Sequence, residues 1–210
     1  MAAAEAAPNL RERSRLETRR RLVEAGTKLF ALRGFARTRA TDISREAGVA
    51  VGTLYVHFTD KEDLLREILF RGFEEMHAVV RRIAETKFAT VEESVRAHTE
   101  ALVSYAAEHP ALFHILFSTE VATTAAGAEL LAALTAHQEE RLREGMVAGY
   151  FRADLDPGVA ARAVIGMLIQ VLHWWTQDPS RAPQDVVIDT VTGLRLSGLH
   201  AKNIEGDETA

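Results

Sequence analysis

Residues 41–65, TDISREAGVAVGTLYVHFTDKEDLL, constrain the fold more than any other part of this 210-residue chain. The apolar residues of the segment have the spacing of two short helices that meet at Gly48, where a residue without Cβ can adopt the left-handed conformation of a tight turn. These apolar residues are Ile43, Ala47, Val49, Leu54 and Phe58. The spacing is typical of a helix-turn-helix.

The second helix of this pair carries small or hydrogen-bonding residues on the face that Leu54 and Phe58 do not use. None of these residues is acidic: they are Val51, Gly52, Thr53, Tyr55 and His57. A helix with such a face fits the major groove of DNA, where side chains contact the edges of the bases. We therefore expect sequence-specific binding to double-stranded DNA, with Thr53 and Tyr55 at the bases and His57 at a phosphate.

This region resembles the DNA-binding segment of TetR-type transcriptional repressors, and the resemblance covers roughly the first third of the chain. The matching residues begin at Ala25, continue through KLFALRGF, Thr38 and DISREAGVAVGTLYVHF, and end with Lys61, Glu62 and Leu64. The resemblance implies a transcriptional regulator. Such a regulator has a DNA-binding head and a helical body that binds a small-molecule effector and forms a homodimer.

One position departs from the pattern of the family. Ala50 stands immediately before the second helix, where the family usually has Ser or Thr, whose hydroxyl caps the helix and can reach a phosphate. The missing cap costs on the order of 1 kcal/mol of local helix stability. The departure argues against a side-chain phosphate contact at this position, and it leaves the expected fold unchanged.

The charge of the chain is distributed unevenly. The net charge is -5, yet residues 10–60 contain eleven Lys or Arg and six Asp or Glu, which leaves +5 in this segment and -10 in the rest. A basic head on an acidic body indicates a protein that contacts DNA at one end. It opposes a non-specific architectural DNA protein, because an acidic body repels the duplex. Cysteine is absent, which excludes disulfides and thiolate metal sites and indicates a bacterial-type cytoplasm.

A single helix is expected ahead of the helix pair, over residues 16–33, and it ends at Gly34. This helix packs behind the two that contact DNA. Thr38 stands where an N-cap of the next helix belongs, and the neighbouring Arg37 and Arg39 are candidate phosphate contacts. We therefore include all three residues in the expected DNA interface.

Two capping-box patterns mark the starts of later helices. Thr59-Asp60-Lys61-Glu62 begins a long helix to about residue 86, with Lys61 in its first turn. A cation at a helix N-terminus opposes the helix dipole, so we expect Lys61 to contact a phosphate. The second pattern, Thr90-Val91-Glu92-Glu93, begins the next helix. The segments expected from there on are a helix to 109, a short apolar stretch from 110, and helices over 123–150, with HQEERLRE facing water, 157–177 and 183–200.

The segment VAARAVIGMLIQVLHWW, which follows the helix-start signal Asp156-Pro157, is apolar nearly all the way round and therefore needs cover on two sides. No run of 18 apolar residues occurs, so no membrane partner is expected. The sequence predicts an all-α fold of about nine helices. It comprises a helix-turn-helix domain over 14–60 and a ligand-binding and dimerisation domain over 61–201, with flexible tails at 1–13 and 202–210.

The last two helices are the expected homodimer interface, because a helix that is apolar on two faces needs its own core and a partner. A symmetric four-helix contact would place two heads in successive major grooves, about 34–36 Å apart, on a palindromic operator. The residues expected in the interface are Val164, Leu168, Val171, Leu172, Trp175, Val187, Val191 and Leu194.

A small-molecule pocket is expected where three helical segments of the body meet. An apolar lining with a few polar groups suits a hydrophobic or aromatic effector. The expected lining is Tyr105, Phe113, Phe117, Met167 and Trp174, with His98, His114, Gln170 and His173 as polar partners. The alternative is that these residues simply fill the core.

No catalytic, metal-binding or cofactor-binding pattern is found in the sequence. There is no Gly-rich phosphate loop, no HExxH and no nucleophile elbow, and the eight histidines are scattered. We therefore expect no enzyme activity, no metal and no cofactor. An all-helical enzyme or small-molecule-binding protein without regulatory DNA binding is the alternative, and turnover of a small molecule without selection of a DNA sequence would favour it.

Overall fold

The computed structural model describes residues 9–199, apart from the side chain of Ala84, and these residues form helices without any strand. The elements are α1 (Leu10–Arg33), α2 (Ala40–Glu46), α3 (Val51–His57), α4 (Lys61–Ala84), α5 (Val91–Glu108), α6 (Pro110–Leu116), α7 (Thr119–Ala122), α8 (Ala125–Val147), α9 (Pro157–Gln177), the 3-10 turn η1 (Pro179–Arg181) and α10 (Gln184–Leu199). The predicted all-α fold is confirmed. The short α7 is present in addition to the nine expected helices.

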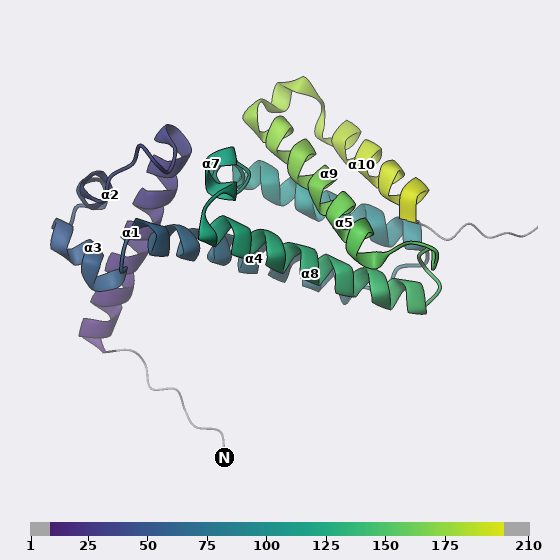
Figure 1. The fold of residues 1–210 in the computed structure, drawn as a ribbon, viewed down its shortest axis with the longest axis horizontal. Helices are drawn as coiled ribbons and strands as arrows, with labels where there is room; N and C mark the ends of the chain where they lie inside the picture. The colour runs from purple at the N-terminus through teal and green to yellow at the C-terminus, as the bar shows by residue number, and fades with distance from the viewer. Residues whose placement is uncertain (1–8, 200–210) are drawn as a thin grey trace, which may run out of the picture.

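The molecule is elongated, with a head at one end and a body at the other (Figure 1). The head is formed by α1, α2 and α3. The body is formed by α5 to α10, and α4 extends from the head along the body, where it packs against α5 and α8. Two further helix pairs, α8 with α9 and α5 with α10, complete the body.

The first helix begins earlier than the sequence predicts. α1 starts at Leu10, and the side chain of Asn9 caps it by accepting a hydrogen bond from the backbone N–H of Glu12 at 2.9 Å. The expected flexible tail is therefore wrong for residues 9–13. The other residues of the two expected tails, 1–8 and 202–210, lie outside the described part of the chain.

A compact apolar core fixes the head. It consists of buried side chains from all three helices, and these include Leu22, Phe30, Ile43, Leu54 and Phe58. The turn between α2 and α3 passes through Gly48 at φ 66°, as the helix-turn-helix pattern predicts. A Cβ at this position would lie 2.6 Å from Nη2 of Arg21. Glycine is therefore favoured by both the backbone angle and the available space.

Thr38 does not have the predicted role. The N-cap of α2 is Arg39, one residue later, and Thr38 is only 1% exposed. Its hydroxyl donates a hydrogen bond to the carbonyl of Gly34 at 2.8 Å and so closes the loop between α1 and α2. Thr38 stabilises the fold of this loop, and it has no surface to offer to DNA.

The long helix α4 begins at Lys61, as expected, but Asp60 caps it instead of Thr59. The Asp60 carboxylate accepts a hydrogen bond from the backbone N–H of Asp63 at 2.8 Å. The helix has 24 residues and spans about 36 Å at 1.5 Å per residue. Its first three turns bury Leu64, Leu65, Ile68 and Leu69. One rigid element therefore connects the core near the head with the body.

The helix α9 packs inside the body along one side. The buried residues on that side are Ala160, Ala161, Val164, Leu168, Leu172 and Trp175. Among the described helices, α9 alone is long and apolar enough for a membrane span, with a mean hydropathy of 1.3 in its most apolar window. Length and composition are weak grounds for a span, because core helices pass the same test. Here α9 packs on α8 and α6.

Candidate DNA interface and effector cavity

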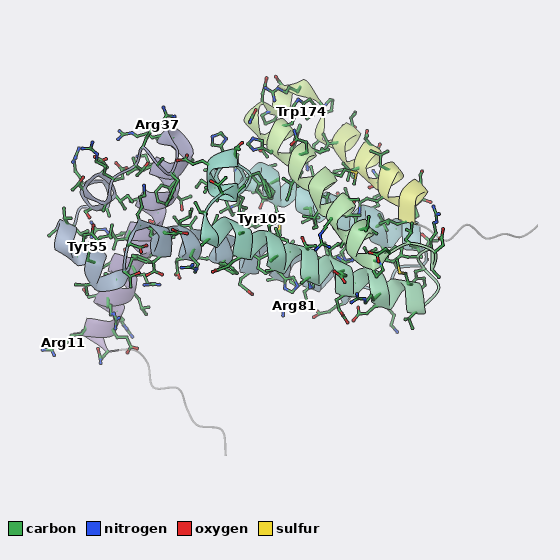
Figure 2. The ribbon with its side chains drawn as sticks, viewed as in Figure 1. Arg11, Arg37, Tyr55, Arg81, Tyr105 and Trp174 are labelled. Atoms are coloured by element: carbon green, nitrogen blue, oxygen red, sulfur yellow. The ribbon has the colours of Figure 1, made fainter. Side chains whose placement is uncertain are left out.

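The helix α3 presents an exposed face at the outer end of the head. Leu54 and Phe58 are buried in the head core, whereas Val51 is 39% and Tyr55 is 56% exposed. Figure 2 shows Tyr55 pointing away from the body. Gly52 is also exposed, and a Cβ added to it would have no neighbouring atom within 4 Å. Thr53 and His57 are half-buried.

One exposed residue of this face was missed by the sequence analysis. Val56 is 70% exposed and lies beside Tyr55. Val56 was placed neither in the buried face with Leu54 and Phe58 nor among the DNA-contacting residues. An apolar side chain can nevertheless contact a thymine methyl group. The structure also leaves α3 without a side-chain cap at Ala50, as the sequence predicts.

Arg37 and Arg39 are exposed on the head beside α2. The Arg37 guanidinium donates from Nε to the carbonyl of Arg33 at 2.9 Å, which leaves its remaining N–H groups for a phosphate. His57 differs from these arginines. Burial, with the charges of Arg15 and Arg19, lowers the pKa of His57, so its imidazole is neutral at pH 7 and offers only a neutral hydrogen bond.

Lys61 points into the protein, against the expectation of a free phosphate contact. Its ammonium donates to the carbonyl of Phe35 at 2.7 Å and to that of Thr38 at 3.1 Å. It also lies 4.2 Å from the centre of the Phe35 ring. Burial lowers the pKa of Lys61. Its main role is therefore to hold the loop between α1 and α2 against α4.

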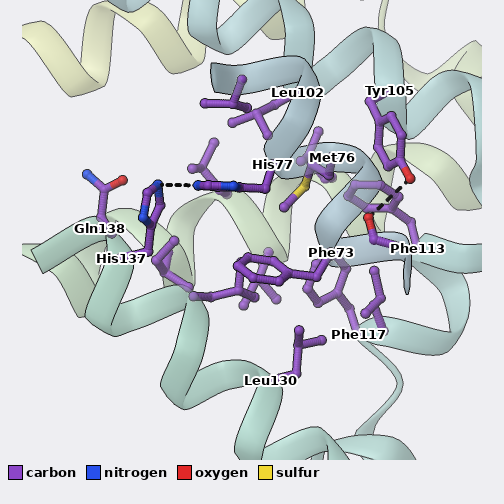
Figure 3. A pocket seen from close by; sticks show the side chains of 18 of the residues that line it. Phe73, Met76, His77, Leu102, Tyr105, Phe113, Phe117, Leu130, His137 and Gln138 are labelled. Atoms are coloured by element: carbon purple, nitrogen blue, oxygen red, sulfur yellow. Dashed lines mark hydrogen bonds between the residues drawn. The ribbon is translucent and has the colours of Figure 1, made fainter. Parts of the chain in front are cut away.

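The body encloses an apolar cavity of about 90 Å³ between α4, α5, α6, α8 and α9 (Figure 3). Four of the nine residues expected to bind a ligand line it: His98, Tyr105, Phe113 and Phe117. The Tyr105 hydroxyl donates to the carbonyl of Gly72 at 3.2 Å. Burial, with a contribution from Glu75, raises the pKa of Tyr105 to about 12, so the phenol stays neutral.

The other five expected ligand residues lie elsewhere. Gln170 and Trp174 are exposed on the outer side of α9, and Trp174 projects from the surface in Figure 2. Met167 lines a separate groove between α9 and α10. His114 and His173 do come together, with ring centroids 5.9 Å apart, but outside the cavity. These five residues are therefore corrections to the predicted cavity.

Several cavity residues were missed because they belong to helices that the sequence analysis did not consider for the pocket. From α4 come Phe73, Met76 and His77, and from α8 and α10 come His137, Gln138, Arg141 and Arg195. The Nε2 atoms of His77 and His137 lie 3.0 Å apart (Figure 3). A signal was present in α8: Gln138 and Leu142 are buried four residues apart inside the stretch expected to face water, and Gly145 is buried directly after it.

Six residues expected in the dimer interface are buried in the core of their own subunit, at 7% exposure or less: Val164, Leu168, Leu172, Trp175, Val187 and Val191. Leu168 and Leu172 line the cavity instead. Val171 is half-buried, and Leu194 is 56% exposed. The predicted inward and outward faces of α9 were thus exchanged, because a nearly all-apolar helix has no polar stripe to orient it.

An apolar surface remains exposed on α9 and α10. Val159 of α9 and Leu194 of α10 are 67% and 56% exposed. These two residues line a groove of about 430 Å³ between the helices, together with Ala163, Met167 and Gly198. Trp174 and Val186 add exposed apolar area on the same two helices. This surface, which shares Leu194 with the predicted one, is available to a second subunit.

The head and the cavity together define a class of protein. A helix-turn-helix head, joined by one long helix to an all-helical body with an apolar cavity, is the architecture of a DNA-binding transcriptional regulator that carries a small-molecule site. Comparison with known families agrees. Residues 22–68 match the family described as "Bacterial regulatory proteins, tetR family". Residues 86–199 match the family described as "Tetracyclin repressor-like, C-terminal domain". This chain belongs to the TetR family of transcriptional regulators.

Individual relatives match along most of their length. The transcriptional repressor KstR2 of Rhodococcus jostii is 31% identical over 85% of this chain and 87% of its own length. The fatty acid degradation regulator FadR of Bacillus halodurans has a TM-score of 0.74 at 24% identity, over 86% of this chain and 99% of that one. FadR of Bacillus subtilis, solved in complex with stearoyl-CoA, has a TM-score of 0.72 at 22% identity, over 86% of this chain and 99% of that one.

Proposed function

We propose that this regulator is a cytoplasmic repressor that binds a palindromic operator as a homodimer and is released by a small apolar or aromatic effector. The head binds the DNA, and the body holds the effector and forms the dimer. The observation that carries the proposal concerns the helix α4. Residues of its second half line the apolar cavity, and residues of its first turns are buried next to the head. No enzymatic step is assigned to the protein.

The DNA interface is assigned to the exposed face of α3 and the arginines beside α2. Tyr55, Thr53 and Val56 are the proposed base contacts, because base edges carry the sequence information in the major groove. Arg37 and Arg39 are the proposed phosphate contacts, which add affinity without sequence preference. Val51 and Gly52 lie at the start of α3, where small residues allow a close approach of the helix to the duplex.

The homodimer interface is assigned to the outer faces of α9 and α10. Exposed apolar area of this kind on a helix pair indicates an interaction surface. A symmetric contact of two such pairs gives the four-helix arrangement expected from the sequence, although with different residues. The proposed contacts are Val159, Met167, Val171, Trp174, Val186 and Leu194, and of the residues first predicted only Val171 and Leu194 are retained.

The path from effector to DNA runs along α4. Phe73, Met76 and His77 line the cavity, and Lys61 of the same helix holds the loop that precedes α2. A ligand that binds better to one orientation of α4 must shift the equilibrium between orientations. Such a ligand therefore changes operator affinity by the same factor by which DNA changes ligand affinity.

Two further contacts connect the head end of α4 to the body. The Glu62 carboxylate accepts from the backbone N–H of Ala125 at 3.0 Å, at the start of α8. Arg66 pairs with Glu129 at 2.9 Å. Movement of α4 against α8 would have to break or rearrange these contacts.

The cavity is small, so we expect the effector to enlarge it on binding. About 90 Å³ is well below the roughly 300–1,000 Å³ of pockets that hold drug-sized ligands. A ligand must therefore displace lining side chains, and four of these belong to α4: Phe73, Met76, His77 and Val80. The complex of a related FadR with stearoyl-CoA supports a ligand with a long apolar chain for this fold.

The test is selection of bound duplexes from a randomised DNA pool, followed by effector titration. The proposal predicts enrichment of one palindrome, and release of that DNA by an apolar compound that also changes tryptophan fluorescence. Enrichment of no sequence, with turnover of a small molecule, would favour the alternative of an all-helical enzyme or binding protein.

A further inference from the structure

Two arginines lie inside the body without an acidic partner. Arg195 of α10 is 7% exposed, and its Nη1 donates to the Thr99 hydroxyl at 2.7 Å. Its Nε has no hydrogen-bond partner. Arg141 of α8 is half-buried and forms no ion pair and no hydrogen bond within residues 9–199. Charges withdrawn from water are unfavourable unless they are paired, so two unpaired cations side by side need an explanation.

The pKa shifts of the two arginines also indicate that no nearby negative charge compensates them. Burial, with the like charge of Arg141, lowers the pKa of Arg195 to about 10. Burial also lowers the pKa of Arg141, and Glu144 opposes this effect only in part. Glu144 is exposed and is the one acidic residue among the described residues that line this region. A net positive field therefore remains in the space that both arginines face.

The two arginines stand on the border between two spaces. One is the apolar cavity, and the other is an open groove of about 540 Å³ beside the loop between α4 and α5. Arg141, Arg195, His98 and Gln138 line both. Figure 3 shows Gln138 at one side of the cavity, next to His137. A ligand that fills the cavity must pass or touch these polar groups to reach the groove.

We propose that the effector is an amphipathic anion, with its apolar part in the cavity and its carboxylate or phosphate on Arg141 and Arg195. This inference rests on the proposed function, because it names the chemical class of the effector. The anion supplies the charge that the two guanidiniums lack, and its polar portion extends into the groove. His98 is buried with Nε2 unpaired, while its Nδ1 lies 2.7 Å from the Ser94 carbonyl. Its Nε2 can therefore accept a hydrogen bond from an O–H or N–H of the same ligand.

The chemistry is tested by direct binding measurements on the DNA-free full-length protein. Dodecanoate, dodecanoyl-CoA and neutral 1-dodecanol share one apolar chain and differ in the head group. We expect at least one of the two anions to bind about tenfold more tightly than the alcohol, since hydrogen bonds to charged groups are the stronger ones. Dodecanoate and dodecanoyl-CoA distinguish a free carboxylate from a phosphate-bearing thioester. Equal affinity for anions and alcohol would overturn the proposal.

Variants assign the effect to the arginines. R141M and R195M are each expected to weaken binding of the preferred anion about tenfold and to leave binding of 1-dodecanol unchanged. R143M is the matched control, because Arg143 lies on the same helix but is exposed and paired with Glu139. The fold is expected to survive, since removal of an unpaired buried charge is often neutral or stabilising. Unchanged anion affinity in both R141M and R195M would contradict the proposal.

Two further outcomes remain distinguishable. The acidic residues Glu205, Asp207 and Glu208 lie outside the described part of the chain. If the wild type binds anions and alcohol equally, and only the E205Q/D207N/E208Q variant prefers anions, then these acidic residues neutralise the two arginines and the proposal is wrong.

Operator binding is measured separately on the same samples. Loss of sequence-specific DNA binding would contradict the proposed function, whereas the anion preference tests the ligand class alone.

Discussion

The Glu120 carboxylate accepts a hydrogen bond from the backbone N–H of Phe35 at 3.0 Å, and it binds the neighbouring N–H of Ala36 as well. Glu120 lies on α7 of the body, and Phe35 lies in the loop between α1 and α2 of the head. This contact joins the two parts of the molecule independently of α4. It therefore fixes the orientation of the head relative to the cavity.

Replacement of Glu120 by alanine is expected to loosen this connection. Two loop N–H groups lose a charged acceptor, which is worth about 1–3 kcal/mol of stability. We also expect the factor by which an effector changes operator affinity to fall, while effector affinity itself stays the same. Thermal unfolding and operator titrations with and without effector measure both effects. E140A is the control, because Glu140 of α8 is exposed, and equal behaviour of the two variants would remove Glu120 from the coupling path.

Lys61→Ala is expected to destabilise the head. The variant loses the hydrogen bonds to the carbonyls of Phe35 and Thr38 and the contact with the Phe35 ring, together about 1–3 kcal/mol. Urea unfolding measures this change. K28A removes a lysine of the head from an exposed ion pair and should change stability by less than about 1 kcal/mol. A normal stability for K61A, with a salt slope of DNA binding flattened by about 0.9, would restore the phosphate contact first predicted.

Leu194→Arg is expected to separate the dimer. A charge in the centre of the apolar surface on α9 and α10 cannot be paired in a symmetric contact, because each subunit brings the same charge. Sedimentation at micromolar concentration should show a dimer for the wild type and a monomer for L194R. L131R is the control, since Leu131 of α8 is exposed to a similar degree, 47%. A dimer that L194R leaves intact but L131R disrupts would move the interface to α8.

Stability is expected to fall as the pH falls below about 6.5. Burial lowers the pKa values of His98, His137 and His173 from the ordinary value of 6.5. The unfolded chain then binds more protons than the folded chain, so acid favours unfolding, and each pKa unit corresponds to about 1.4 kcal/mol. Melting temperatures between pH 8 and pH 5 measure the slope. H98N should flatten it, and an identical slope would show that His98 has no part in it.

The sequence predicted the parts of this structure that have local signals. The turn at Gly48, the caps Thr90 and Asp156, and the proline at the start of α9 each involve residues a few positions apart, and all agree with the structure. Asn9 provides a similar signal for the early start of α1, because it precedes Glu12 at capping distance. This signal was overlooked within a polar, Arg-rich segment.

The cavity and the dimer surface depended on contacts that no local pattern contains. The helix α9 is apolar on almost every side, so its sequence alone did not determine whether Leu168 or Met167 points inward. The inward position of Arg141 was equally hidden, because it lies in a charged stretch that is typical of a solvent-exposed face. Lys61 was assigned to a phosphate from its place in the first turn of a helix. The carbonyls that it contacts belong to a loop more than 20 residues earlier in the chain, so no local pattern indicates them.

Selection of DNA by wild-type protein and by the Y55A variant tests the central claim most directly. The wild type should enrich a palindrome with half-sites about 10 base pairs apart, or a multiple of that spacing. Y55A should lose discrimination at defined base positions while it keeps the non-specific, salt-dependent affinity. Y150A is the matched control, because Tyr150 lies in the body and is equally exposed, at 56%. Unaltered base preferences in Y55A, or no preference in the wild type, would contradict the assignment of α3 as the helix that reads DNA.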